Sequence, residues 1–449
     1  MNNKFLNKIN LFLLFSILLL AGAAQQSLAA TLTVTKAADT NDAVCNADCS
    51  LREAVAVAQE YDEIKFAANL AGQTITLSNS ISISKSLTIT GIDTLKISGG
   101  NLVRIFSIMN GAKATLRNLD LGNGYMDSRQ QPFVGVGGAI AVYWSSLELD
   151  DCYVHNSKAF TWGGGIWAIG SAVIIKNSLI AANKANAGGG GISIQGSRLS
   201  ISNTRFNLNG AATNGGAVWV SDCRMLMRDS SIYKSSAKSG GALYLTEAND
   251  KGVYTIRDSA IHHNSAQSAG GIYNEATLNL INSTVSSNYA TAGSGGGLSN
   301  HNQAFLRNVT MTLNNATGDA GGINSVSGDV NFGNTIVAAN TNAGNFSPNI
   351  KGNVTSAGFN VIGPSVSAVF WGDQTGNQFN VIDPMLMPLA YNGSVTLNHH
   401  PKAGSPVIDA GSDALATDEF NNMLLTDQRG VNRISGGVVD IGAVETVNE

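Results

Sequence analysis

The residues of this chain best suited to chemistry on a carbohydrate are four aromatic and three acidic side chains between positions 167 and 275. They are Trp167, Trp219, Tyr244, Tyr273, Asp222, Glu247 and Glu275. Exposed rings beside carboxylates form a surface on which sugars can stack while their hydroxyls bond to the acids. The three acids are also the candidate catalytic groups, since a glycoside hydrolase needs two suitably separated carboxylates. In the alternative, stacked rings only stabilise the outer face of a sheet.

Other groups that a polysaccharide-degrading enzyme needs are scarce. A lyase needs a carboxylate cluster that holds Ca²⁺ and a Lys or Arg that acts as the base. The acidic pair Asp150 and Asp151 has no Gly-His-Gly or Arg-x-Lys sequence beside it. The adjacent His262 and His263 should point to opposite faces of a strand, which disfavours a shared metal. We therefore predict no metal site and no cofactor, with Ca²⁺ as the alternative.

These candidates lie in a stretch, residues 137 to 340, that repeats one pattern eight times. Each copy has a pair of glycines, then an Asn or Asp, then an apolar residue three positions further on. The second glycines, which set a period of 25 to 30 residues, are Gly138, Gly165, Gly191, Gly216, Gly241, Gly271, Gly297 and Gly322. The amides of the following column are Asn177, Asn203, Asn282, Asn308 and Asn334, and Asp151, Asp229 and Asp258 complete it.

Repetition at this period indicates an architecture of stacked units. Apolar residues alternate within each repeat, as in 199–201, which indicates short strands. A coil of about 25 residues with two or three strands is one turn of a parallel β-helix, with ~4.8 Å between turns. Glycine permits positive φ and close approach, stacked Asn side chains can bond along the axis, and the apolar column fills the interior. A β-propeller is disfavoured, because its blades need about 40 to 45 residues.

Residues 1 to 30 have the form of a secretory signal peptide. Lys4 and Lys8 precede an apolar run over 11–20, and small residues surround Ala29. The run is about half of the ~20 residues that span a membrane. Its removal changes the formal charge from −4 to −6, because two lysines and no acid are lost. We expect an exported protein, secreted, periplasmic or on the cell surface, with no integral membrane segment and no nucleic-acid partner.

Export permits disulfides, so the four cysteines need assignment. Cys45 and Cys49 are four residues apart and are predicted to be bonded; two free thiols are the alternative. Cys152 and Cys223 lie three repeats apart, or ~14 Å at the spacing of stacked strands. A disulfide needs Cα atoms within about 7 Å, so these two are predicted to be small core side chains.

Residues 50–53, Ser-Leu-Arg-Glu, have the form of a helix capping box. A short amphipathic helix over about 50–59 would cover the open first turn of the coil. The surrounding residues 49–54, with Asp42 and Cys45 before them and 64–66 and 74–77 after them, closely resemble the domain named CSLREA. Proteins with that domain are exported bacterial right-handed parallel β-helices of the pectate-lyase-like superfamily, which implies a right-handed coil here.

Two further resemblances cover most of the remaining chain. The repeats, most plainly at 206–209, are similar to those of chlamydial polymorphic outer-membrane proteins, although the C-terminal barrel of those proteins has no counterpart in this sequence. Residues 404–411, 427–430 and 440–445 look like the domain called choice-of-anchor Q, which in its relatives precedes a surface-anchoring tail. That resemblance again implies export.

The sequence thus predicts an all-β, right-handed parallel β-helix with a short N-terminal capping helix and an irregular C-terminal cap. Its parts are a signal peptide (1–30), an N-terminal cap (31–61), irregular turns (62–136), regular turns (137–340) and last turns with a C-terminal cap (341–449). About twelve turns would make a rod of roughly 60 Å. We expect a non-enzymatic, adhesin-like scaffold that binds glycans or a cell surface. The alternatives are a polysaccharide lyase or glycoside hydrolase and a purely structural envelope protein.

Overall fold

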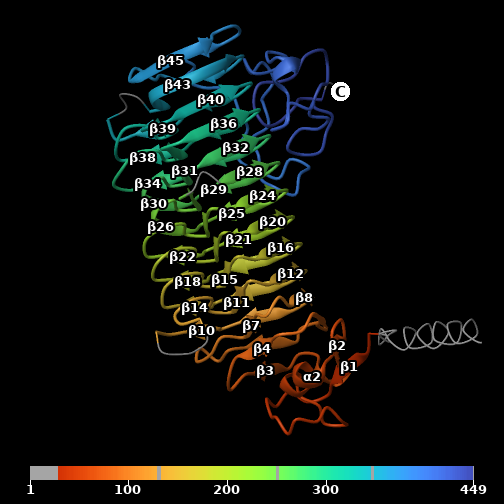
Figure 1. Ribbon diagram of the computed structural model, residues 1–449. Coiled ribbons are helices and arrows are strands. Elements are labelled where there is room, and N and C mark those ends of the chain that lie inside the picture. Colours follow the sequence, from red (N-terminus) through yellow and green to blue (C-terminus); the bar gives the residue numbers. More distant parts are fainter. Residues whose placement is uncertain (1–28, 129–132, 249–251, 345–347, 448–449) are drawn as a thin grey trace, which may run out of the picture.

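The computed structural model describes residues 29–128, 133–248, 252–344 and 348–447, so the predicted signal peptide falls almost wholly outside the described residues. The chain forms a parallel β-helix (Figure 1), and every pairing between described strands is parallel. One turn of the coil comprises β15 (Ile166–Ile169), β16 (Ala172–Lys176), β17 (Leu179–Ala181) and β18 (Lys184–Ala185). The predicted fold class is confirmed, with a short fourth strand where the sequence indicated two or three.

The first two strands of each turn build two sheets, sheet 1 and sheet 2. Sheet 1 contains β4 (Ile81–Ile83), β7 (Phe106–Ile108), β11 (Ile140–Tyr143), β15, β19 (Ile192–Gln195), β23 (Val218–Ser221), β27 (Leu243–Thr246), β31 (Ile272–Glu275), β35 (Leu298–Asn300) and β39 (Ile323–Ser325). Sheet 2 contains β1 (Thr31–Val34), β2 (Glu63–Phe66), β5 (Leu87–Thr90), β8 (Lys113–Arg117), β12 (Ser146–Asp150), β16, β20 (Arg198–Ser202), β24 (Arg224–Arg228), β28 (Val253–Arg257), β32 (Thr277–Ile281), β36 (Gln303–Arg307), β40 (Asp329–Gly333), β43 (Ile350–Gly358) and β45 (Ala368–Asp373). The nine-residue β43 pairs with both β39 and β40, so the two sheets merge in the last turns.

The third and fourth strands of each turn build sheets 3 and 4. Sheet 3 has 13 strands: β3 (Thr74–Thr76), β6 (Lys96–Ser98), β9 (Asp120–Gly122), β13 (Tyr153–His155), β17, β21 (Arg205–Asn207), β25 (Ser231–Tyr233), β29 (Ala260–His262), β33 (Thr284–Ser286), β37 (Thr310–Thr312), β41 (Ile336–Ala338), β44 (Val361–Ile362) and β46 (Gln378–Phe379). Sheet 4 contains β10 (Tyr125–Met126), β14 (Lys158–Ala159), β18, β22 (Gly210–Ala211), β26 (Ser236–Ser239), β30 (Ser265–Ser268), β34 (Tyr289–Ala290), β38 (Asn315–Ala316) and β42 (Thr341–Asn342).

Glycine pairs occupy the place where adjacent turns approach most closely. Gly163 has φ +67°, a conformation that L residues with a side chain rarely adopt. A Cβ added to Gly164 would come within 2.4 Å of the carbonyl oxygen of Gly190 in the next turn. Gly190 meets Gly216 in the same way, also at 2.4 Å. The backbone itself therefore fills this corner, and the period of the glycine pairs is the period of the coil.

The predicted Asn and Asp column forms the corner between sheets 2 and 3, where every member has positive φ. Asn and Asp tolerate this left-handed conformation better than other residues with a side chain. The side chain of Asn203 donates to Asn177 (2.9 Å), and that of Asn334 donates to Asn308 (3.1 Å). Asn282 donates to Asp258 (3.3 Å). Backbone conformation and axial hydrogen bonds together account for the residue types of this column.

A second row of amides lies inside the coil, beside the corner that precedes sheet 4. Asn288 is fully buried, and its Oδ1 accepts from the backbone N–H of Asn264 (3.0 Å). Its Nδ2 donates to Oδ1 of Asn314 (2.9 Å) and to the carbonyl oxygen of Ile261 (2.9 Å). The same pattern continues through Asn340. The row thus satisfies buried backbone groups that face no strand partner.

Helix α2 (Leu51–Val57) covers the first turn of the coil. Ser50 and Glu53 form the predicted capping box, and Leu51 is buried against the interior. The predicted disulfide between Cys45 and Cys49 is present, and Cys152 and Cys223 are free and buried. Two short 3₁₀ helices, η1 (Ala68–Leu70) and η2 (Asp413–Leu415), flank the coil. No helix in the described part of the chain is both long and apolar enough to cross a membrane.

The C-terminal segment, residues 383–447, is irregular and returns along the coil, where it covers the outer face of sheet 3 in its later turns (Figure 1). Its contacts run through several turns: Thr426 accepts from Asn282 (2.7 Å), His399 bonds Ser286 (2.9 Å), and the N–H of Ala443 donates to Thr310 (3.0 Å). The segment therefore covers a side of the coil, while β45 and β46 form its end.

Candidate functional site

The four predicted aromatic residues lie on the outer face of sheet 1 in one column, which we call the aromatic column. Register pairs Trp167 with Ser193, Ser193 with Trp219, Trp219 with Tyr244, and Tyr244 with Tyr273. The four rings are half-buried. Serine interrupts the column once, so three of the four rings stand in consecutive turns.

The tyrosine rings of the aromatic column stack on one another along the axis. The centroids of Tyr244 and Tyr273 are 4.7 Å apart with the planes within 5°, and His301 stacks on Tyr273 at 4.5 Å. Trp219 packs instead against Trp162, with centroids 4.6 Å apart at 46°. The rings of Tyr244 and His301 cover the two faces of the Tyr273 ring. A ligand can therefore contact only the edge and the hydroxyl of Tyr273.

Glu275 and Tyr244 form the only contact between a predicted acid and a predicted ring among the described hydrogen bonds. The Tyr244 hydroxyl donates to Oε2 of Glu275 over 2.8 Å. Burial raises the pKa of the Tyr244 phenol, and the hydrogen bond to the carboxylate raises it further. The phenol therefore stays protonated at neutral pH and remains a donor.

The other two predicted acids lie at the corner between sheets 1 and 2. Asp222 has φ +52° and accepts from the backbone N–H of Ala248 (2.7 Å). Glu247 accepts from the backbone N–H of Gly252 (3.0 Å) and from Nδ2 of Asn302 (2.9 Å). These bonds connect the acids to the described residues on either side of this corner. No hydrogen bond among the described residues joins Asp222, Glu247 and Glu275 to one another, so each acid has its own structural partners.

A groove of about 810 Å³ follows the corner between sheets 1 and 2, and we call it the corner groove. Its lining includes Trp144, Arg198, Asp222, Arg224 and Val253. Trp144 is 63% exposed, and Tyr143 beside it is 41% exposed. Both guanidinium groups are exposed and form no ion pair with the described residues. The groove therefore combines a broad aromatic surface with exposed guanidinium groups that can donate hydrogen bonds.

Backbone conformation explains why a tryptophan can lie in this corner. Trp144, Gly170 and Gly196 occupy equivalent positions in successive turns, all with positive φ. A Cβ at Gly170 would come within 2.6 Å of the Trp144 ring, so the ring lies directly over that glycine. Sequence reasoning missed this groove. The signal that could have revealed it is the pair of glycines one and two periods after an outward-facing tryptophan.

The two adjacent histidines contact each other, which corrects the expectation that they face opposite sides. His263 has φ +55°, so the alternation of a strand ends at His262. Their Nδ1 atoms are 2.9 Å apart, and burial lowers the pKa of both rings. Within the described ranges, no group of three or more His, Cys, Asp or Glu side chains is arranged to hold a metal ion.

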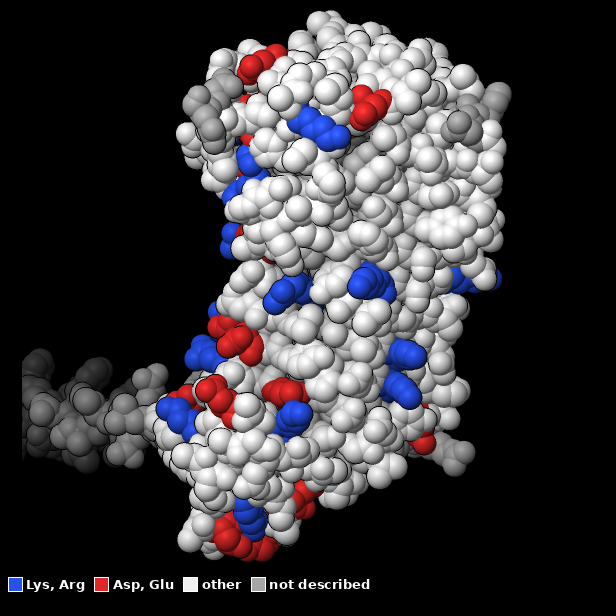
Figure 2. All heavy atoms as spheres, turned by 180° about the vertical axis from the view of Figure 1, so that it is seen from behind, with Lys and Arg blue, Asp and Glu red and all other residues white. Residues whose placement is uncertain are grey.

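Charge is sparse on the face of the molecule shown in Figure 2. Lys and Arg lie among Asp and Glu there, and most of the surface is uncharged. Charged residues make up 13% of the whole sequence. Local features therefore decide what the surface can bind, more than any long-range field.

Comparison with known proteins supports the fold. Residues 138–316 match a family model described as the right-handed beta helix region. No curated protein matches the sequence. The crystal structure of pectate lyase Pel9A aligns over 93% of this chain and 97% of its own, with 13% sequence identity and a TM-score of 0.42, values at which the likeness carries no functional information. The resemblances of the two ends of the chain stay predictions. The coil itself is a right-handed parallel β-helix.

Proposed function

We propose that this protein is an exported scaffold that binds glycans through the corner groove and the adjoining aromatic column. The proposal depends mainly on Trp144, an exposed indole that lies across Gly170 in a groove that also contains the exposed Arg198 and Arg224. An indole face gives a sugar ring an apolar surface, and guanidinium groups donate to hydroxyl or carboxylate oxygens. Export is supported by the predicted leader and by the disulfide, which is typical of oxidising compartments.

A binding role agrees better than catalysis with the bonding of the three acids. Asp222, Glu247 and Glu275 each accept hydrogen bonds from protein groups, and one carboxylate oxygen of Glu275 accepts from the Tyr244 hydroxyl. A catalytic pair would need two carboxylates on opposite sides of a scissile bond. The acids are therefore proposed to brace the surface that the aromatic residues present.

The test is a glycan array with the mature protein and its Trp144→Gly variant. Glycine is already the residue at this corner in the next two turns, so the substitution keeps the backbone unstrained. We expect at least a 10-fold loss of affinity, equivalent to about 1.4 kcal/mol. Trp371→Ala is the matched control, because Trp371 is 61% exposed but lies in β45 at the end of the coil.

Equal binding by the Trp144→Gly variant would remove the corner groove from the proposed function. A Trp219→Ala/Tyr244→Ala variant then tests the aromatic column alone. New reducing ends or unsaturated sugars after incubation with polysaccharides, with and without Ca²⁺, would instead show that the protein is an enzyme. Absence of any glycan ligand for the intact protein would contradict the proposal as a whole.

A further inference from the structure

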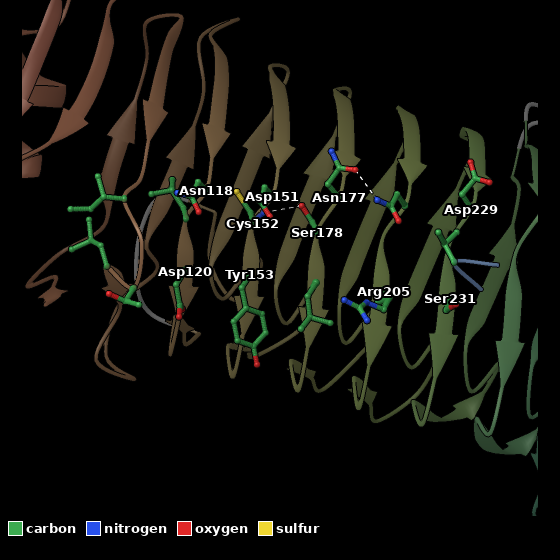
Figure 3. Close-up of a pocket in the computed structure, with 17 residues that line it drawn as sticks. Asn118, Asp120, Asp151, Cys152, Tyr153, Asn177, Ser178, Arg205, Asp229 and Ser231 are labelled. Carbon is green, nitrogen blue, oxygen red and sulfur yellow. Dashed lines mark hydrogen bonds between the residues drawn. The ribbon is translucent and has the colours of Figure 1, made fainter. Parts of the chain in front are cut away.

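A second groove lies on a different side of the coil, over the early turns of sheet 3 (Figure 3), and we call it the sheet 3 groove. It has a volume of about 520 Å³. Two parallel rows of side chains line it: Asn118, Asp151, Asn177, Asn203 and Asp229 from the corner, and Asp120, Tyr153, Leu179, Arg205 and Ser231 from the sheet. Figure 3 labels four residues of each row, among them Asn177 and Tyr153. Each turn contributes one residue to each row.

The chain itself closes both ends of this groove. Ile92, Thr94 and Leu95 line the N-terminal end, and Val395 of the C-terminal segment lines the other. Beyond Val395 the same face is covered, since Thr396 reaches the carbonyl oxygen of Asp258 (3.4 Å). Four turn-to-turn steps separate Asn118 from Asp229, which is ~19 Å at the spacing of stacked parallel strands. The groove therefore suits a short, elongated ligand.

Sheet 3 changes character between its covered and uncovered turns. Under the C-terminal segment the register position of Arg205 is held by Ala260, Thr284, Thr310 and Ile336, which are small or apolar. In the open turns it is held by an acid, a tyrosine, a leucine and an arginine. Small and apolar residues suit close packing against protein, whereas charged groups and phenols suit a hydrated ligand rich in hydroxyls.

Hydrogen bonds hold the lining in place before any ligand arrives. Asn177 donates to Asp150 (2.8 Å), and Nε2 of His155 lies 2.6 Å from Asp120. Tyr153 stacks on His155, with centroids 4.1 Å apart. A lining fixed in this way loses little conformational freedom on binding.

A peptide strand would find no backbone partners in this groove. The backbone N–H of Asp151 donates to Lys176 in the next turn (3.2 Å), and that of Asn177 donates to Ser202 (3.1 Å). These corner groups are used by the coil, so β-strand addition has no free edge here. Hydrogen bonds to a ligand in this groove therefore come from side chains, and such bonds suit the hydroxyl groups of a sugar.

We propose that the sheet 3 groove binds a neutral oligosaccharide that runs along the axis of the coil. Its repeating lining of carboxylate, amide and guanidinium groups pairs with hydroxyls, and Tyr153 and Leu179 supply apolar surface. Asp120, Asp151 and Asp229 outnumber Arg205, so an acidic polymer is disfavoured by charge. This site is independent of the corner groove, and a molecule with both sites can bridge two glycan chains.

The test measures binding of neutral cello-, xylo- and chito-oligosaccharides of increasing length by calorimetry, with an oligogalacturonate as the acidic arm. Tyr153→Leu places in this turn the residue that the next turn already has, and should weaken neutral binding about 10-fold. Trp371→Ala is the matched control and should leave this binding unchanged, because Trp371 is exposed and lies in β45, outside both grooves. Affinity should rise with chain length and then level off once the groove is filled.

A second variant tests the charge argument. Asp151→Asn/Asp229→Asn keeps residues suited to positive φ and should bring in measurable binding of the oligogalacturonate. The proposal is overturned if Tyr153→Leu binds neutral oligosaccharides as the parent does, if the parent prefers the acidic arm, or if no neutral oligosaccharide of any length binds. Loss of glycan-array binding on Trp144→Gly with calorimetry unchanged would separate the two sites.

Discussion

Replacement of Asn288 by alanine should destabilise the coil strongly and locally. The side chain makes four hydrogen bonds within the buried row: two accepted from Asn264, one donated to Ile261 and one donated to Asn314. A hydrogen bond contributes about 1 kcal/mol net, and a buried group left without a partner costs at least as much. Loss of all four should therefore cost about 4 kcal/mol.

The matched variant is Asn288→Ser, because Ser235 holds the equivalent place in another turn. There the Ser235 hydroxyl accepts from the backbone N–H of Asn209 (3.3 Å), the counterpart of the bond that Asn288 accepts from the backbone N–H of Asn264. Since serine restores one of the four bonds, we expect the serine variant to lose about 3 kcal/mol, against about 4 kcal/mol for the alanine variant. Chemical denaturation gives the free energy of unfolding, and hydrogen exchange locates the loss in the turns that contain residues 264–314.

Equal costs for the alanine and serine variants would refute the reasoning, because the serine restores one acceptor and alanine restores none. A loss of protection spread evenly over the whole coil would also refute it. Nearest-neighbour coupling between turns confines the damage in a solenoid.

Three further predictions concern pH and covalent structure. Burial lowers the pKa of His262 to about 3, below the ordinary value of about 6.5, so acid favours the unfolded state, in which this histidine is protonated. The free energy of unfolding should therefore fall by about 2 kcal/mol between pH 7 and pH 5 because of this one group. Denaturation of the His262→Gln variant at the two pH values should lack this decrease. Burial raises the pKa of Glu445 to about 7, so stability should fall as pH rises from about 4.5 to 7, and Glu445→Gln should flatten that trend in melting curves. Reduction of Cys45–Cys49 should cost about 2 kcal/mol, seen as lost exchange protection confined to 31–61.

The repeating part of the fold could be predicted because each column has a local physical cause. A glycine such as Gly164 is required where two backbones meet, and Asn177 is suited to positive φ whatever surrounds it. Such causes act within one turn and its neighbour, so the period alone reveals them. The register of Trp219, Tyr244 and Tyr273 followed from the same count.

Features that depend on lateral packing could not be predicted in this way. Nothing in the C-terminal segment repeats, so no pattern indicated that Thr426 would contact Asn282, 144 positions earlier. The contact of His262 with His263 depends on one left-handed residue, a position that Asn, Ala, Leu, Lys or Ser fill in other turns. The corner groove depends on side chains that are missing at glycines, which a search for reactive groups passes over.

The spacing of the coil also decides which aromatic residues can receive a sugar ring. Parallel strands place equivalent residues ~4.8 Å apart, which is close to the contact distance of stacked rings. Neighbouring tyrosines in one column therefore stack on each other, as Tyr244 and Tyr273 do with ring centroids 4.7 Å apart. A free ring face requires a turn whose neighbour has no side chain. Trp144 meets this condition twice: one face of its indole lies on the backbone of Gly170, and Gly111, at the equivalent place in the previous turn, has no side chain that could cover the other face. The 63% exposure of Trp144 agrees with an open face. Hydroxyl contacts are thus expected along the aromatic column, and stacking is expected at the corner groove.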